Sequence, residues 1–303
     1  MRQKLILLFL FILPAYLSGS SLTAGETGMA FLKLGVSGRA VGMAEAYTAI
    51  ADDASATYWN PAGLAQLNSA ELMFTQNQWL QDVRHNFFAL AFGTKSHHFG
   101  LSFISNTVDG IERRTKPSTE PIGTFEAHEL AVGLSYAKMI GNSFGFGVTL
   151  KYLYERIYIE SSPGAAVDLG CLYSPAWLAG FRMGAVLQNL GKMSDLQEDP
   201  IELPTAMRAG VAYSLPGSIS GARLLIATDV AKIFKSTYHA NLGMEVDFRR
   251  IISLRCGYQT GWDEKGLNGG FGFRYSRYAV DYGFTPFTRD LGSSHRISLN
   301  VRF

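Results

Sequence analysis

The sequence predicts an all-β protein, an antiparallel transmembrane β-barrel of about 14 strands with an N-terminal plug. Three observations predict it: apolar and polar side chains alternate with a period of two, many runs are about ten residues long, and the connections are alternately long and short. Of the 303 residues, 47% are hydrophobic and 17% are charged, against roughly a quarter in ordinary globular domains. No long apolar run follows the N-terminus, so a helical membrane protein is not expected.

Residues 1–20 have the pattern of a secretory signal peptide. Arg2 and Lys4 precede an unbroken apolar stretch at Leu5–Leu13, and small residues follow at Ser18–Ser20, as at a cleavage site. No cysteine follows the apolar stretch, so we exclude a lipoprotein, and an uncleaved anchor is the remaining alternative. Export of a barrel implies the outer membrane of a Gram-negative bacterium, with outer-membrane lipid around it.

The segment 25–67 is predicted to form a compact plug. It is rich in alanine and glycine and lacks the alternation of a strand. A short helix is expected over Ala44–Ala51. Asp52 or Asp53 is expected to cap the next turn or to form a salt bridge with an arginine of the barrel wall. Cation binding by these two carboxylates is the weaker alternative, because no further acidic partner is near in the sequence.

Residues 69–303 are predicted to form the barrel. In the stretch 144–154 every even position is apolar, whereas the odd positions are mostly small or polar. In a membrane barrel the apolar set faces lipid and the polar set faces the lumen. The predicted strands are 70–80, 84–94, 97–108, 125–140, 143–157, 164–175, 180–190, 204–215, 222–233, 238–249, 251–260, 267–276, 278–286 and 294–303.

Charged residues recur on the parity predicted to face the lumen. Their side chains are expected to pair with one another and with the plug, and an anion-selective pore is the alternative interpretation. The basic members are Arg182, Arg208, Arg255, Arg274, Arg296 and Arg302, and the acidic members are Glu155, Asp168, Glu245, Asp247 and Asp281.

Aromatic and cysteine residues fit the outer wall of such a barrel. Aromatic side chains near strand ends predict girdles at the two membrane interfaces; they are Trp79, Tyr152, Tyr154, Tyr158, Trp177, Trp262 and Tyr278. Cys171 and Cys256 lie on the apolar parity. We interpret both cysteines as small lipid-facing or buried residues, with a disulfide as the alternative.

The connections predict how the barrel is oriented. The two longest are 109–124 and 191–203, the third and seventh along the chain, whereas most even-numbered connections are tight. Long loops outside and short turns in the periplasm are typical of bacterial barrels. The last predicted strand ends on Phe303 with the apolar parity, which places this end of the strand on the periplasmic side.

The segment Asn60-Pro61-Ala62-Gly63 is the most specific local feature. Functionally it would gate the lumen or contact a ligand. Structurally, proline fixes φ, glycine permits a tight turn, and the asparagine amide pairs with backbone groups. We favour the structural role. Catalytic motifs, metal-ligand spacings and cofactor-binding loops are absent from the sequence, which predicts neither an enzyme nor a metal or cofactor protein, and no basic run indicates nucleic-acid binding.

The stretches Leu34–Met43 and Ala51–Leu64, together with Gln188-Asn-Leu-Gly191, resemble the PorV/PorQ family of outer-membrane proteins. That family is similar to the wider FadL-like superfamily of long-chain fatty-acid transporters, which shares the Asn-Pro-Ala-Gly segment. The resemblance implies a fourteen-stranded barrel with a plug. It also implies two roles. The first is an accessory or cargo-binding barrel in protein export of the type IX kind, docking a secretion barrel or secreted cargo at the outer loops. The alternative is a diffusion channel for a hydrophobic ligand.

Overall fold

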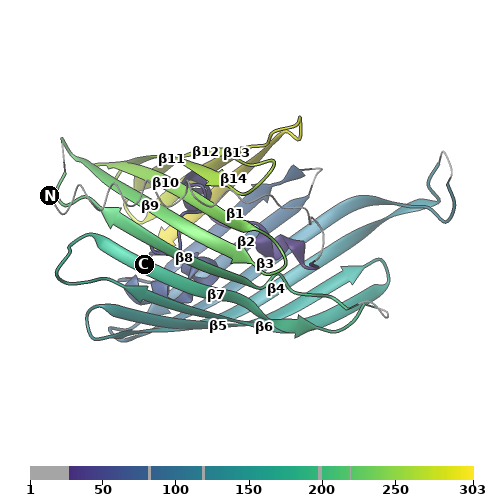
Figure 1. The fold of residues 1–303 in the computed structure, drawn as a ribbon, viewed down its shortest axis with the longest axis horizontal. Helices are drawn as coiled ribbons and strands as arrows, with labels where there is room; N and C mark the ends of the chain where they lie inside the picture. Colours follow the sequence, from purple (N-terminus) through teal and green to yellow (C-terminus); the bar gives the residue numbers. More distant parts are fainter. Residues whose placement is uncertain (1–26, 81–82, 118–119, 197–199, 219) are drawn as a thin grey trace.

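The computed structural model describes residues 27–80, 83–117, 120–196, 200–218 and 220–303; the predicted signal peptide lies outside them. Fourteen strands of the described chain form one closed antiparallel barrel in which every strand pairs with its sequence neighbours, and β14 closes on β1 (Figure 1). The strands are β1 (Glu71–Gln78), β2 (Arg84–Gly93), β3 (His97–Arg113), β4 (Gly123–Ile140), β5 (Phe144–Ile157), β6 (Glu160–Tyr173), β7 (Phe181–Met193), β8 (Ala206–Ser214), β9 (Ala222–Ile233), β10 (Tyr238–Phe248), β11 (Ile252–Thr260), β12 (Leu267–Tyr275), β13 (Tyr278–Pro286) and β14 (Ser293–Arg302).

Two regions depart most from the predicted strands; elsewhere the bounds differ by at most three residues, and β14 ends at Arg302 instead of at Phe303. β3 and β4 run on into the segment expected to be a long loop and form a hairpin that projects beyond the barrel (Figure 1). β6 begins at Glu160, so a two-residue turn replaces the loop expected before residue 164. Pro163 is tolerated there because pairing of β6 with β7 starts only at Gly164, so the missing N–H of Pro163 breaks no ladder bond on that side.

The outer wall is apolar and exposed, as the alternation predicts. In β5, Phe144, Phe146, Leu150 and Tyr152 are each about half exposed, whereas the intervening odd residues are mostly buried. A continuous apolar surface of this size around a closed barrel is the lipid-facing wall of a membrane barrel. Cys171 and Cys256 lie on it as free thiols, so the disulfide alternative is wrong. No helix of the described residues is long and apolar enough to cross a membrane.

The barrel interior is filled by the segment that precedes β1. It contains four short helices, η2 (Ala30–Lys33), α2 (Gly38–Gly42), α3 (Ala56–Trp59) and η3 (Pro61–Gln66), and most of its residues are fully buried. The helix expected over Ala44–Ala51 is not formed. Ala44, Glu45 and Ala51 have φ values of 53°, 62° and 26°, which a right-handed helix cannot accommodate.

Inward-facing glycines of the wall let the plug approach the barrel backbone closely. A methyl group added at Gly147 would lie 2.3 Å from the carbonyl carbon of Pro61, and one at Gly243 would lie 2.4 Å from the Met43 oxygen. At Gly283 the nearest atom would be the Gly38 oxygen, at 2.7 Å. Real Cβ atoms do not come this close to backbone, so the plug and the wall fit together only because these positions lack a side chain.

Candidate functional site: the plug and the two mouths of the barrel

The plug reaches from one end of the barrel to the other. We call the end where β14 finishes the C-terminal end and the opposite end, with the odd-numbered connections, the loop end. At the loop end, Gly28 packs against Ile201 of the β7–β8 connection. At the C-terminal end, the Leu67 carbonyl lies 3.2 Å from Nε2 of His98, beside the β2–β3 turn. Passage through the lumen must therefore go past or displace the plug.

Asn60 connects the plug to the barrel wall and also connects separate parts of the plug to each other. Its side-chain amide donates to the Thr48 carbonyl at 2.9 Å and to the Cys171 carbonyl of β6 at 3.1 Å. Its side-chain oxygen accepts from the Ala62 N–H at 3.2 Å and caps η3. All of these contacts are with protein backbone, which agrees with the structural role favoured from the sequence.

The other residues of the Asn-Pro-Ala-Gly segment act through shape. Pro61 occupies the first position of η3, where its missing N–H costs no hydrogen bond. Gly63 packs so tightly that an added methyl would lie 2.0 Å from the Ala51 oxygen. The segment is buried on all sides, so ligand contact there requires the plug to move.

Arg39 is the centre of a charge network between plug and wall. Its guanidinium lies 2.5 Å from Asp52 and 2.8 Å from Glu245 of β10. The second oxygen of Asp52 lies 3.5 Å from Arg182 of β7. Asp53 instead accepts from the Tyr47 hydroxyl at 2.7 Å and from the Ser55 N–H at 3.0 Å, as a capping carboxylate.

The two adjacent carboxylates have opposite pKa shifts. Burial alone would raise the pKa of Asp52, but Arg39 and Arg182 hold it below its ordinary value. Burial raises the pKa of Asp53, and the charge of Arg39 together with the hydrogen bonds from Ser55 and Tyr47 only partly opposes that shift. Asp52 is therefore the ionic anchor of the plug, and Asp53 is its internal cap. The described residues contain no group of acidic, histidine or cysteine side chains that could hold a metal ion.

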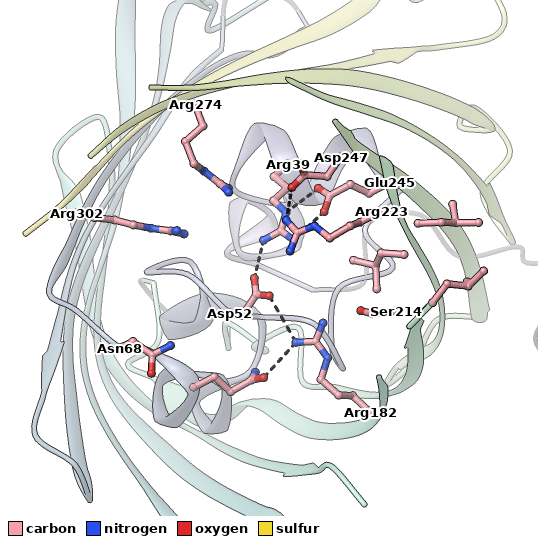
Figure 2. Close-up of a pocket in the computed structure, with 14 residues that line it drawn as sticks. Arg39, Asp52, Asn68, Arg182, Ser214, Arg223, Glu245, Asp247, Arg274 and Arg302 are labelled. Carbon is pink, nitrogen blue, oxygen red and sulfur yellow. Dashed lines mark hydrogen bonds and ion pairs between the residues drawn. The ribbon is translucent and has the colours of Figure 1, made fainter. Parts of the chain in front are cut away.

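A cavity of about 360 Å³ opens at the C-terminal end beside this network (Figure 2). Arg39, Asp52 and Arg182 form one side of it, and Arg274 and Arg302 point into it from β12 and β14. We call it the C-terminal cavity. The remaining lining residues come from the plug, the segment after it, and β8–β10: Gln66, Asn68, Ser214, Leu215, Arg223, Leu224, Leu225, Glu245 and Asp247.

The other predicted lumen charges also point inward, and most have partners. Arg255 bridges Glu245 and Asp281, with 2.7 Å to each. Lys151, which the sequence interpretation did not single out, lies 2.6 Å from Asp168 at a register shift between β6 and β7. The structure thus agrees with a wall that pairs its own charges more than with an open anion pore.

Two predicted lumen arginines are held against tryptophan rings. Arg208 lies over Trp59 of the plug at 5.3 Å, and Arg296 lies over Trp79 at 5.2 Å. Guanidinium groups over aromatic faces gain cation–π attraction that partly replaces lost hydration. Glu155 is buried on the same inward parity.

A second pocket, of about 270 Å³, lies at the loop end. Its walls are mostly apolar: Trp79 and Leu80 follow β1, Trp262 follows β11, and Phe287 and Leu291 follow β13. We call it the loop-end pocket. On the side of the plug, the pocket is lined by residues of the stretch from Ala30 to Leu34.

Lys265 lies between the two tryptophans of this pocket. Its ammonium is 4.4 Å from the Trp262 ring and 5.3 Å from the Trp79 ring, and burial lowers its pKa. The sequence interpretation placed both tryptophans in interfacial girdles, and that assignment is wrong. Of the remaining predicted girdle residues, Tyr152, Tyr158, Trp177 and Tyr278 are exposed.

Comparisons with known proteins place this geometry in context. The pattern of an uncharacterised protein family, UPF0164, matches residues 20–109, which span the plug and the first strands. No curated protein matches the sequence. The solved structure of the CymD monoaromatic hydrocarbon channel is similar with a TM-score of 0.65 and 14% identity, covering 89% of this chain and 97% of that one.

The fold is similar to that of known hydrocarbon channels. The toluene transporter TodX of P. putida matches with a TM-score of 0.62 and 10% identity, over 86% of this chain and 98% of its own. A FadL homologue from Pseudomonas aeruginosa matches with a TM-score of 0.53 and 12% identity, over 87% and 97%. At these identities the likeness concerns the plugged barrel itself, and the resemblance to the PorV/PorQ family stays a prediction.

Proposed function

We propose that this protein is an outer-membrane channel for small hydrophobic molecules. The observation that carries the proposal is the loop-end pocket, an apolar, tryptophan-lined recess inside a barrel mouth whose outer face is lipid-facing. The similarity of the fold to hydrocarbon channels supports it.

The dimensions of the pocket suit a small ligand. An apolar cavity of about 150 Å³ holds benzene, so the volume of about 270 Å³ accommodates a single-ring or short aliphatic compound. Trp79 and Trp262 supply flat apolar faces, on which an aromatic ring gains contact area and favourable ring geometry. From this entry site the ligand passes on when the plug shifts.

Uptake of radiolabelled toluene by cells that express the protein tests the proposal. Replacing Trp79 and Trp262 together by alanine is expected to lower the initial uptake rate several-fold, because the apolar walls are lost. Trp177→Ala is the matched control, since Trp177 lies in the β6–β7 turn at the C-terminal end and is 74% exposed. Equal uptake by cells with and without the protein would remove the channel function.

The accessory role in protein export remains a prediction of the resemblance to the PorV/PorQ family alone. It requires docking at the outer loops, of which the β3–β4 hairpin projects farthest from the barrel (Figure 1). No contact among the described residues favours this role over transport.

A further inference from the structure

The C-terminal cavity has more cations than carboxylates. Its described lining residues include five arginines, Arg39, Arg182, Arg223, Arg274 and Arg302, but only three acids, Asp52, Glu245 and Asp247. Guanidinium groups are permanently charged, so the net charge of the side chains that line this cavity is positive at any physiological pH. The question is which of the arginines are neutralised by the protein itself.

Three of the five are paired with these acids. Arg39 takes Asp52 and Glu245, Arg182 takes the second oxygen of Asp52, and Arg223 lies 2.9 Å from Asp247. The carboxylates that line the cavity are therefore already engaged. None of them is left to neutralise the arginines on β12 and β14.

Arg274 and Arg302 have no partner among the carboxylates that line the cavity. Arg302 forms an ion pair with Glu71, which does not line the cavity, at 3.7 Å, beyond hydrogen-bond distance. Arg274 makes no ion pair within the described part of the chain, and its Nε is buried without a hydrogen-bond partner. Figure 2 shows both guanidinium groups directed into the same open space, with no interaction drawn from either. A buried donor without a partner is costly unless water or a ligand accepts its hydrogen bond.

A neighbouring recess extends the same positive surface. It measures about 590 Å³ and shares Arg223, Arg274 and Arg302 with the C-terminal cavity, adding Arg250 from the β10–β11 turn. No acidic residue is among its described lining residues. Four arginines from β9, the β10–β11 turn, β12 and β14 thus converge on one space.

We propose that this arginine recess binds an oxyanion of the phosphate type, held chiefly by Arg274 and Arg302. A planar guanidinium group can donate two hydrogen bonds to one oxyanion. When the guanidinium groups come from several strands, they are best satisfied by a ligand whose acceptor oxygens point in several directions from one central atom. A phosphate group has that shape, whereas a single carboxylate offers two oxygens in one plane. The proposal does not depend on the channel function, because the recess lies at the opposite end of the barrel from the loop-end pocket.

Calorimetric titration of the full-length protein in a zwitterionic detergent tests this inference. Inorganic phosphate and short-chain phosphatidic acid are titrated separately at matched ionic strength, with acetate as the carboxylate probe. We expect saturable binding of at least one phosphate probe and weaker binding of acetate. Saturation by phosphate alone assigns a soluble ligand, and saturation by the lipid alone assigns a phospholipid headgroup; either result supports the site.

Arg274→Gln is the decisive variant. Among the described residues, the substitution removes the ion-pair partner of no carboxylate, so the barrel is expected to fold. Folding is checked by the shift in gel mobility that a folded barrel shows on boiling. Loss of the charge-assisted hydrogen bonds of Arg274 is expected to weaken phosphate binding about tenfold or more, and Arg302→Gln is expected to act in the same direction. Arg289→Gln, at the loop end and 67% exposed, is the matched control and is expected to bind as the wild type does.

Three outcomes would overturn the proposal. They are the absence of saturable binding by both phosphate probes, binding that is unchanged in Arg274→Gln, and binding of acetate as tight as that of phosphate.

Discussion

The side-chain amide of Asn60 donates to the backbone carbonyl of Cys171 at 3.1 Å and so fastens the plug directly to strand β6. On the other face of the same strand, the Cys171 side chain lies on the exposed apolar wall. A single peptide layer therefore separates the anchor of the plug from lipid.

Replacing Asn60 by alanine is expected to loosen the plug. The change leaves the Thr48 and Cys171 carbonyls and the Ala62 N–H without their partner, at a cost of about 1–3 kcal/mol for a buried unsatisfied group. Single-channel recording in planar bilayers should show more frequent or larger openings than the wild type. Asn142→Ala, in the exposed β4–β5 turn, is the control, and identical conductance in the two variants would contradict the anchor.

Adding one methyl group at Gly170 is expected to unseat the plug. The new Cβ would lie 2.2 Å from the side-chain oxygen of Asn60, and overpacking of this kind typically costs about 1–3 kcal/mol. The midpoint temperature of the gel-mobility shift should fall in Gly170→Ala. In Gly269→Ala the new methyl meets nothing nearer than 4.0 Å, so an equal fall in both variants would refute the close-approach explanation.

Removing the charge of Asp168 is expected to destabilise the wall strongly. Asp168→Asn leaves the ammonium of Lys151 buried at 6% side-chain exposure without its counter-charge, which typically costs about 3–5 kcal/mol. Urea unfolding in lipid should show the loss, and Lys151→Met in the same chain should restore part of it. The exposed pair Arg84–Asp109 serves for comparison, since breaking such a pair costs at most about 1 kcal/mol.

Lowering the pH is expected to weaken the ion pair between Arg39 and Asp52. Because the pKa of Asp52 in the folded protein lies below its ordinary value, the ionised carboxylate stabilises the fold above the unfolded pKa of about 3.9. That stabilisation is lost as the pH falls through the folded pKa. The wild type should be more stable than Asp52→Asn at pH 7, and the difference should shrink below about pH 4. A difference that stays constant down to pH 2 would show that the charge of Asp52 is not what stabilises the plug.

The barrel could be predicted from the sequence because its signal is local. Alternation with a period of two marks each strand independently, and β9 and β13 begin and end at the predicted residues. The parity of the inward charges follows from the same rule, so Arg255, Glu245 and Asp281 were placed in the lumen correctly. The start of β6 was missed because Pro163 resembles a turn residue until its pairing partners are known.

The interior of the plug could not be predicted, since its conformation is set by distant contacts. The left-handed residues Ala44 and Glu45 carry no local signal, and their sequence favours a helix. Arg39 was overlooked as a charged centre because Glu245 lies 206 residues away in the chain. Trp79 and Trp262 resemble girdle residues in sequence, and only the closure of the barrel brings both around Lys265.

The plug fills the lumen of a closed barrel, and this position bears on the order in which the plug and the strands assemble. The plug is followed by β1, and β1 closes the barrel by pairing with β14, which comes after the other thirteen strands in the described chain. The glycines that meet the plug lie on strands from β3 to β13, so these strands can form a curved open sheet before closure. We expect the plug to be seated in that open sheet first, and pairing of β14 with β1 then encloses it.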